Sequence, residues 1–312
     1  MQKELKKMQP RVAAIHDLSG FGRCSLTIIL PVLAAAGIEV CPLPTAVLSS
    51  HNGLPDRTFC DLTGQLLPAA EQWDRLGLQF DAVYSGFLGS AQQIEVVRNV
   101  FSLLSGEHTL RFVDPVMGDN GRLYSCYSPE MAGGMKQLVA CADVVVPNLT
   151  EAALLLDREP VLEPGEEELM QLLRSVAALG PRLTVITGVR RGSRVGAAVY
   201  DREKDTTAFA LADSISGTYH GTGDLFASVM LAALLRGESA STAAETAAGF
   251  VSRVIRATRD AGTDPQFGVS FEPLLPELMR MLIMVGTARE EISFGTGVCV
   301  IRKNCRCSLV SV

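Results

Sequence analysis

Short apolar runs alternate with longer stretches of helical period along most of the chain. The short runs are rich in Val, Ile or aromatic residues and end at Gly, Pro or Asn, which predicts β-strands. They cover residues 12–17, 40–48, 81–88, 110–116, 143–147 and 183–189. Apolar positions at helical spacing predict helices over 25–36, 91–104, 128–140 and 166–179. The alternation predicts a three-layer α/β/α fold whose central sheet is mostly parallel and covered on both faces.

The parallel pattern is interrupted at two places. Pro42 and Pro44 lie inside the run 40–48 and confine it to an edge or an irregular strand. The runs 195–200 and 206–211 flank a polar turn, which predicts an antiparallel hairpin at one edge of the sheet. The pattern is then helical again, over 224–235, 241–258 and 271–284.

One domain is expected to account for most of the chain, because no internal repeat and no linker divides it. We expect residues 1–284 to form this domain, although about 150 residues per domain would suggest two. Residues 285–312 have no clear period and end in a basic, cysteine-bearing run. We expect this last stretch to be a disordered or loosely docked C-terminal tail.

Composition and charge limit the class of protein. Of the 312 residues, 47% are hydrophobic and 20% are charged, which is enough apolar sequence for a large core. The formal net charge of −6 argues against nucleic acid or an anionic membrane as a partner. No apolar stretch near the start reaches the roughly 20 residues that span a bilayer, and no secretory signal is evident. The eight cysteines form no CxxC pair, so we expect reduced thiols and a cytoplasmic protein.

The strongest chemical pattern is His220-Gly-Thr-Gly-Asp224, directly before an apolar helix. Gly221 and Gly223 let successive backbone N–H groups point into one space, and the helix adds its positive end, which suits a phosphate. Asp224 would repel that phosphate in the ground state, so its presence suggests a general base for an attacking hydroxyl. The alternative is that Asp224 is an ordinary helix cap.

Three further loops at expected strand ends carry unusual polar residues. Asn148 and Glu151 either cap a helix or present oxygen ligands to Mg²⁺ or its waters. Asp114 and Asp119 stand in a loop with two glycines that suits a metal–phosphate contact or a solvated turn. Thr187-Gly188 either lines a nucleotide site or simply ends a strand.

Several common site patterns are missing from the sequence. There is no GxxxxGK[ST] phosphate loop, and no GxGxxG follows the first expected strand, which disfavours a dinucleotide-dependent dehydrogenase. Ser25 has no GxSxG pattern around it, so a hydrolase triad has no anchor. The four histidines lack HExxH spacing, and His16 and His108 are interpreted as structural.

Taken together, these loops resemble the ribokinase-like superfamily and, within it, the pyridoxal/pyridoxamine kinases. The match runs from about residue 11 to residue 284. It rests on Asp17-Leu-Ser-Gly-Phe-Gly22, Thr45, Ser85-Gly-Phe-Leu-Gly-Ser90, Asp114-Pro-Val-Met-Gly118, Asn148-Leu-Thr-Glu151 and Gly221-Thr-Gly-Asp224.

The resemblance implies transfer of the γ-phosphate of ATP to the 5′-hydroxymethyl group of a B6 vitamer. Asp224 would be the base, and the N–H groups of Gly221, Thr222 and Gly223 would hold the phosphate. The other implied roles are Mg²⁺ ligation by Glu151 and Asn148, ATP binding by Asp114, Asp119, Asn148, Thr187 and Gly188, and ring binding by Asp17, Thr45, His51 and Phe87. Residues 119–127 would be a lid. A homodimer is implied, and a monovalent cation such as K⁺ is a further expected cofactor.

Two residues depart from the pyridoxal kinase pattern, which commonly has Ser where Asp17 stands and Tyr where Phe87 stands. The charge of Asp17 favours a protonated pyridine nitrogen or an aminomethyl group, so we hypothesise a preference for pyridoxamine. The nearest alternative is a hydroxymethylpyrimidine kinase, whose members usually carry Cys at the position of Asp224. A non-catalytic vitamer-binding protein is a further alternative, and a sugar kinase is disfavoured because its Gly-Gly-Asn loop is absent.

Overall fold

A nine-stranded sheet lies at the centre of the molecule, with strand order β11-β10-β9-β8-β5-β4-β1-β2-β3. The computed structural model describes residues 9–290, without the side chains of 283–290. The sheet strands are β1 (Arg11–Ser19), β2 (Glu39–Leu48), β3 (Phe59–Asp61), β4 (Ala82–Ser85), β5 (Leu110–Val113), β8 (Val144–Val145), β9 (Leu183–Arg191), β10 (Arg194–Asp201) and β11 (Thr206–Asp213). Strands from β2 through β9 run parallel in this order, and β3 and β10 are antiparallel to their neighbours.

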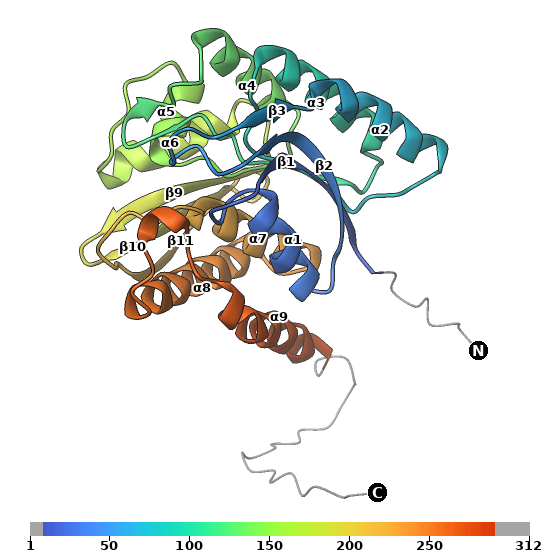
Figure 1. Cartoon of the computed structure of the whole chain (residues 1–312). Coiled ribbons are helices and arrows are strands. Elements are labelled where there is room, and N and C mark those ends of the chain that lie inside the picture. Colours follow the sequence, from blue (N-terminus) through green and yellow to red (C-terminus); the bar gives the residue numbers. More distant parts are fainter. Residues whose placement is uncertain (1–8, 291–312) are drawn as a thin grey trace, which may run out of the picture.

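Helices cover both faces of the sheet, as the alternating pattern predicts (Figure 1). One face carries α1 (Leu26–Ala35), α7 (Thr222–Leu235), α8 (Ala240–Asp260) and α9 (Leu275–Glu290). The other carries α2 (Thr63–Arg75), α3 (Ala91–Leu104), α4 (Pro129–Ala140), α5 (Leu149–Leu155) and α6 (Glu166–Ala177). The three-layer α/β/α fold is therefore confirmed.

The two cores follow from the alternation of side chains along each strand. In β1, Val12 and Ala14 pack with α1, α7 and α8, whereas Ala13 and Ile15 pack with α2 and α3. All four side chains are fully buried. A strand that is apolar on both sides is typical of a parallel sheet covered by helices on both faces.

The two expected irregularities of the sheet are both present. The hairpin β10–β11 is antiparallel and forms one edge, with Tyr200 opposite Thr207 next to its turn. At the other edge, β3 pairs only with residues 46–48 of β2. Pro42 and Pro44 pair in register with β1 and have no strand on their other side among the described residues, so their missing N–H groups cost no ladder bond.

The sequence analysis predicts neither α2 nor the short strands β3, β6 and β7. The strand β3 and the helix α2 lie in a stretch that contains Gly64 and Pro68, two residues that normally argue against helix. The strands β6 (Gly118–Asp119) and β7 (Arg122–Leu123), of two residues each, form a separate hairpin. Its turn has Asn120 at φ 51° and Gly121 at φ 77°, the positive values that a type I′ turn requires.

The C-terminal helix is longer than its pattern predicts. It continues to Glu290, whereas the helical period ends near residue 284. The rest of the expected tail, 291–312, lies outside the described residues. No helix in the described part of the chain is both long and apolar enough to cross a bilayer.

Candidate active site

The carboxyl ends of the parallel strands bring the predicted polar loops to one edge of the sheet. Asp17 lies near the C-terminal end of β1, and Asp114 follows β5 directly. Asn148 begins α5 just after β8, and Asp224 lies in the first turn of α7. Ligands of doubly wound sheets bind at this edge, so the sequence argument places its candidates in a suitable position.

Asp224 and Asp17 are joined through one residue that the sequence analysis set aside. The backbone N–H of Ser25 donates to Oδ2 of Asp224 at 2.8 Å. The Ser25 hydroxyl donates to Oδ1 of Asp17 at 2.6 Å, and the Ser19 hydroxyl donates to Oδ2 of Asp17 at 3.0 Å. Asp17 and Ser25 are 5% and 6% exposed, so these bonds are shielded from water.

The electrostatics of Asp224 suit proton transfer near neutral pH. Burial raises its pKa to about 7, the Ser25 N–H opposes that rise, and the charge of Asp17 adds to it. Burial also raises the pKa of Asp17, against the hydroxyl bonds from Ser25 and Ser19. A carboxyl group with a pKa close to the ambient pH can both accept and release a proton.

The first turn of α7 offers backbone donors beside Asp224. The N–H groups at the start of a helix have no acceptor within the helix, and they carry its positive end. Gly221 is the N-cap at φ 82° and ψ 0°, a left-handed conformation that glycine adopts without strain. The Thr222 hydroxyl is already used, because it donates to the carbonyl of Tyr219 at 3.1 Å. The turn therefore presents main-chain rather than side-chain donors.

Gly221 also allows the first loop to approach α7 closely. A Cβ atom at this position would lie 2.2 Å from the carbonyl oxygen of Arg23 and 2.7 Å from Cδ1 of Ile28. At Gly223, by contrast, a Cβ would meet nothing within 4 Å. The two glycines of one motif thus have different structural roles.

Asn148 and Glu151 form a helix cap, which is one of the two roles that the sequence suggests for them. The Asn148 side chain accepts from the Glu151 N–H at 2.9 Å, and Glu151 accepts from the Asn148 N–H at 2.8 Å. Both residues also hold the loop after β5. Asn148 donates to the Gly118 carbonyl at 2.8 Å, and Glu151 accepts from the Met117 N–H at 3.1 Å.

Buried carboxyl groups gather where a cation would bind. Burial raises the pKa of Glu151 to about 8, and burial together with the charges of Glu151 and Asp224 raises the pKa of Asp114 well above its usual range. Within the described residues, no ion pair joins any of these carboxylates to Lys or Arg. Carboxyl oxygens without a basic partner suit a hard divalent ion such as Mg²⁺, whose charge would favour their ionised form. No group of three or more acidic, His or Cys side chains among the described residues forms a closed metal cage.

Asp119 lies on the hairpin β6–β7, which docks on the start of α5. The Gly121 N–H donates to the Thr150 hydroxyl at 2.9 Å, which fixes the turn of the hairpin. The charge of Asp119 acts on both Glu151 and His220, so Asp119 lies near both groups. Residues 119–127, the expected lid, thus begin in a short hairpin anchored at the candidate site.

The residues expected to bind a ring have different surroundings. His51 accepts from the Gly53 N–H at 3.0 Å through Nδ1, so its proton lies on Nε2, which donates to the Gln266 carbonyl at 2.7 Å. Its ring lies 4.8 Å from that of His220, which joins its loop to the start of α7. Phe87 packs against Tyr127 of the expected lid, with ring centroids 6.4 Å apart.

Thr45, in contrast, is buried with no hydrogen-bond partner for its hydroxyl, which is therefore available to a ligand or a water. Thr187 adjoins Asn148 through an isolated bridge, and its N–H donates to the Pro147 carbonyl at 2.9 Å. Gly188 follows at φ 76°, where the pairing of β9 with β10 shifts register. Both residues lie at the same edge of the sheet as the other candidates.

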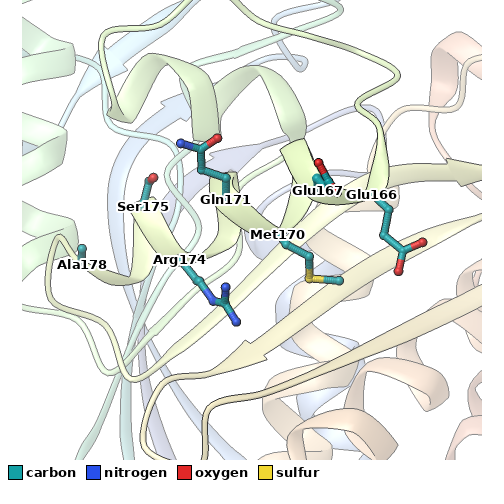
Figure 2. A pocket seen from close by; sticks show the side chains of 7 residues that line it. All are labelled: Glu166, Glu167, Met170, Gln171, Arg174, Ser175 and Ala178. Carbon is teal, nitrogen blue, oxygen red and sulfur yellow. The ribbon is translucent and has the colours of Figure 1, made fainter.

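Two hollows in the surface lie outside this constellation. A groove of about 790 Å³ is lined entirely from α6 and the residue after it (Figure 2). It contains none of the predicted site residues. A second hollow, of about 330 Å³, lies between the first loop and the segment after α8, and its lining includes Gly22, Thr27 and Glu272.

The histidines interpreted as structural include one deeply buried ring. His16 is fully buried, with both ring nitrogens unpartnered, and it packs edge-on against Tyr84 at 4.3 Å. Burial lowers its pKa to about 3, so it carries no charge at neutral pH. His108 is exposed.

Comparison with known proteins identifies the family. Residues 67–268 match the family model described as phosphomethylpyrimidine kinase. A structure titled as a putative phosphomethylpyrimidine kinase from Bacteroides thetaiotaomicron is 38% identical, with a TM-score of 0.85, and the match covers 88% of this chain and 96% of that one. The chain belongs to this family of ribokinase-like kinases.

Pyridoxal kinases are among the relatives of this kinase. The pyridoxal kinase of Lactobacillus plantarum is 31% identical, with a TM-score of 0.81, over 87% of this chain and 97% of that one. Pyridoxal kinase PdxY of Histophilus somni is 28% identical over 272 residues, which cover 79% of this chain and 88% of the relative. The pyridoxal kinase of Leishmania donovani, at 21% identity and a TM-score of 0.74, shares the fold.

The unequal surroundings of the two motif glycines lead to a prediction. Gly221→Ala forces a left-handed alanine against Arg23, so the first loop must move away from α7 and kinase activity should fall about 100-fold. Gly223→Ala is the matched control for stability, and it should keep the melting temperature of the wild type. Thermal unfolding and steady-state kinetics of both variants test this. Equal melting temperatures and equal activities for the two variants would contradict the role of Gly221.

The raised pKa values predict how stability depends on pH. An unfolded carboxyl titrates near about 4, so between that pH and about 7 the folded kinase binds more protons at Asp224 than the unfolded chain does. Stability from this group is therefore lost as the pH rises through that window. Asp224→Asn removes the effect, so its melting temperature should gain on the wild type as the pH rises from about 5 to about 8. A gap that is constant with pH would refute the assignment.

Proposed function

We propose that this kinase transfers the γ-phosphoryl group of ATP to the 5′-hydroxymethyl group of a B6 vitamer. The observation that carries the proposal is Asp224, a carboxyl with its pKa raised to about 7 in the first turn of α7. The comparisons support the substrate class. The Bacteroides thetaiotaomicron relative has a structure titled as a form with pyridoxal, at 39% identity. The Lactobacillus plantarum relative is named a pyridoxal kinase.

In the proposed reaction, Asp224 accepts the proton of the vitamer hydroxyl as its oxygen bonds to the γ-phosphorus. The bond between that phosphorus and the bridging oxygen breaks, and ADP leaves with its electron pair. Oδ2 of Asp224 is occupied by the Ser25 N–H, and Oδ1 accepts no hydrogen bond from the described residues. Oδ1 is therefore the oxygen available to the substrate proton.

The start of α7 stabilises the charge on the transferred group. The N–H groups of Gly221, Thr222 and Gly223 are aligned with the positive end of a 14-residue helix. Donors fixed before the reaction need no reorganisation as the charge develops. Because the protein has a net charge of −6, such local donors matter more than any general attraction of the surface for phosphate.

In the proposed site, the metal ion would lie beside the acids that follow β5, Asp114 and Asp119, and beside Glu151 on α5. Glu151 and Asn148 would hold Mg²⁺ or its waters, with Asp114 and Asp119 close to the phosphates. When bound, Mg²⁺ neutralises phosphate charge and orients the chain of phosphates. Thr187 and Gly188 are proposed to line the nucleotide side of the same edge.

The ring side is proposed to consist of Asp17, Thr45, His51 and Phe87. The unpartnered hydroxyl of Thr45 offers a polar contact, and the ring of Phe87 offers an apolar one. Residues 119–127 are proposed to cover the substrates and exclude water, which would otherwise hydrolyse ATP. A homodimer, a cytoplasmic location and a K⁺ requirement remain predictions, which light scattering, cell fractionation and assays with and without K⁺ can check.

A hydroxymethylpyrimidine kinase is the second candidate. The description of the matching family favours it, since that family is named for phosphomethylpyrimidine kinase. The acid at position 224 opposes it, because such enzymes usually have Cys there. Both candidates phosphorylate a hydroxymethyl group on a nitrogen heterocycle, so the same geometry serves either substrate.

The decisive assay offers the purified kinase ATP and Mg²⁺ with pyridoxal, pyridoxine, pyridoxamine or hydroxymethylpyrimidine. We expect phosphorylation of the B6 vitamers and a kcat for Asp224→Ala that is lower by about 10² or more, with little change in ATP affinity. Turnover of the pyrimidine alone would support the second candidate. Phosphorylation of none of the four would support a binding protein instead, and near-normal turnover by Asp224→Ala would refute its role as base.

The charge of Asp17 leads to a separate prediction on vitamer preference. If its carboxylate faces the polar edge of the ring, pyridoxamine is preferred over pyridoxal in the wild type. The preference should then diminish in Asp17→Ser. The measurement is the ratio of kcat/KM for the two vitamers in both proteins. A ratio that is close to one in both would eliminate the hypothesis.

A further inference from the structure

Ser25 has a backbone conformation that serine rarely adopts. It precedes α1 at φ 47° and ψ −132°, whereas most residues at the start of a helix have extended dihedral angles and a negative φ. A side chain with a Cβ is strained at such an angle, and strained residues persist only where the surroundings hold them. Ser25 is 6% exposed, so it is held inside the protein.

The Ser25 hydroxyl does not do what a serine hydroxyl normally does at a helix start. Such a hydroxyl usually accepts from a backbone N–H of the first turn, yet the Ser25 side chain makes no cap bond. It donates instead to Asp17 on β1 at 2.6 Å. The strained backbone then directs the Ser25 N–H toward Asp224 on α7, at 2.8 Å.

We propose that Ser25 is a positioning residue for phosphoryl transfer: anchored through its hydroxyl to Asp17, it holds the N–H that orients the Asp224 carboxylate. The bond to Oδ2 fixes one oxygen of Asp224 and leaves Oδ1 free for the substrate. The end of β1, the residue before α1 and the start of α7, which lies 199 residues further along the chain, thereby become one unit. The inference deepens the proposed function and rests on it.

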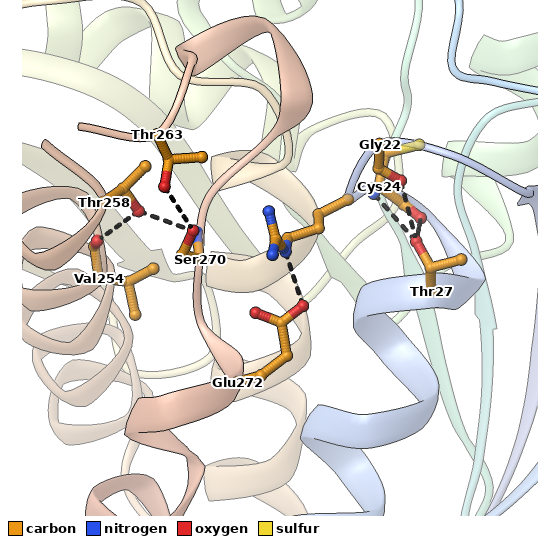
Figure 3. A network of polar contacts seen from close by, with 9 residues as sticks. Gly22, Cys24, Thr27, Val254, Thr258, Thr263, Ser270 and Glu272 are labelled. Atoms are coloured by element: carbon orange, nitrogen blue, oxygen red, sulfur yellow. Dashed lines mark hydrogen bonds and ion pairs between the residues drawn. The ribbon is translucent and has the colours of Figure 1, made fainter. Parts of the chain in front are cut away.

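The rest of the first loop is fixed well enough for such a role. The Thr27 hydroxyl, which follows Ser25, donates to the carbonyl of Cys24, which precedes it, at 2.7 Å (Figure 3). The side chain of Arg23 pairs with Glu272 at 2.6 Å, and the Arg23 N–H donates to the Phe267 carbonyl at 3.3 Å.

The segment that holds Arg23 is itself attached to α8. The Ser270 N–H donates to the Thr258 hydroxyl at 2.8 Å, and that hydroxyl donates to the Val254 carbonyl at 2.8 Å (Figure 3). Glu272 thus reaches Arg23 from a segment that is itself held to α8. The bond from Ser25 to Asp17 ties this loop to β1, next to the proposed base.

The test compares two replacements of Ser25 that differ only in backbone strain. Ser25→Ala removes the anchor and leaves a strained residue, so the backbone relaxes and kcat should fall about tenfold or more, with KM values for ATP and the vitamer within about threefold. Ser25→Gly also lacks the hydroxyl, but glycine adopts this conformation freely. It should therefore retain a higher kcat than Ser25→Ala. Ser19→Ala, which removes the other hydroxyl donor to Asp17, is the matched control and should keep kcat within about twofold.

A double-mutant cycle tests the anchor. If Ser25 acts through Asp17, the kcat of Asp17→Ala/Ser25→Ala should be close to that of the worse single variant, because the second change removes nothing further. Losses that multiply in the double variant would overturn the inference. So would a kcat for Ser25→Ala equal to that of Ser19→Ala, or an equal loss in Ser25→Gly and Ser25→Ala.

A crystal structure of each Ser25 variant gives a readout that does not depend on activity. In Ser25→Ala, we expect the N–H of residue 25 to have moved out of hydrogen-bond distance of Asp224, while Ser19→Ala keeps that bond. An unchanged bond in Ser25→Ala overturns the inference even if the kinase phosphorylates every vitamer. A wild type that phosphorylates no substrate refutes the proposed function, and the structural readout then still decides whether Ser25 positions Asp224.

Discussion

The central constraint on this structure is the gathering of carboxylates at one edge of the sheet. Asp17, Asp114 and Glu151 are at least nine-tenths buried there, and Asp224 joins them from α7. No Lys or Arg in the described part of the chain forms an ion pair with any of the four. An isolated buried charge is costly, so the pKa of each acid is raised by burial.

Backbone and hydroxyl donors partly offset this cost. Glu151 takes N–H groups from Met117 and Asn148, Asp224 takes one from Ser25, and Asp17 takes two serine hydroxyls. These donors have no net charge, so they lower the cost of ionisation without neutralising a carboxylate that does ionise. They also join loops that come from different strands. The interactions that make the acids tolerable are thus the same ones that hold the loops of the site together.

Much of this arrangement follows from short-range sequence patterns. Strand–helix alternation predicts the layers, and the runs around residues 201–205 predict the edge hairpin, because both depend on local periodicity. Sequence analysis missed α2 because Gly64 and Pro68 both disfavour helix. The helix is stabilised by the packing of Leu66 and Ala70 rather than by helix propensity. The hairpin β6–β7 was missed although Asn120-Gly121, a strong turn signal, is present.

The candidate site residues likewise differ in whether a local sequence pattern reveals them. Asp224, Asn148 and Glu151 are recognisable because each belongs to a contiguous motif at the start of a helix, where the spacing of the residues has a structural explanation. Ser25 is not, because its importance comes from two contacts, with Asp17 eight residues away and with Asp224 199 residues away. Sequence spacing suggested only the start of a helix at this position. Its positive φ, which marks the strained junction, becomes visible only once the fold brings Asp17 and Asp224 to Ser25.

The position of Asp17 has a consequence for how charge is controlled in the site. Its carboxylate raises the pKa of Asp224, while the Ser25 N–H that it anchors lowers it. One acid therefore acts on the base in two opposing ways, through its charge and through the residue that it holds. Loss of the charge and loss of the anchor should move the pKa of Asp224 in opposite directions. A neutral residue at position 17 that still accepted the Ser25 hydroxyl would keep the geometry but make the base weaker, which is a physical reason for an aspartate at this position.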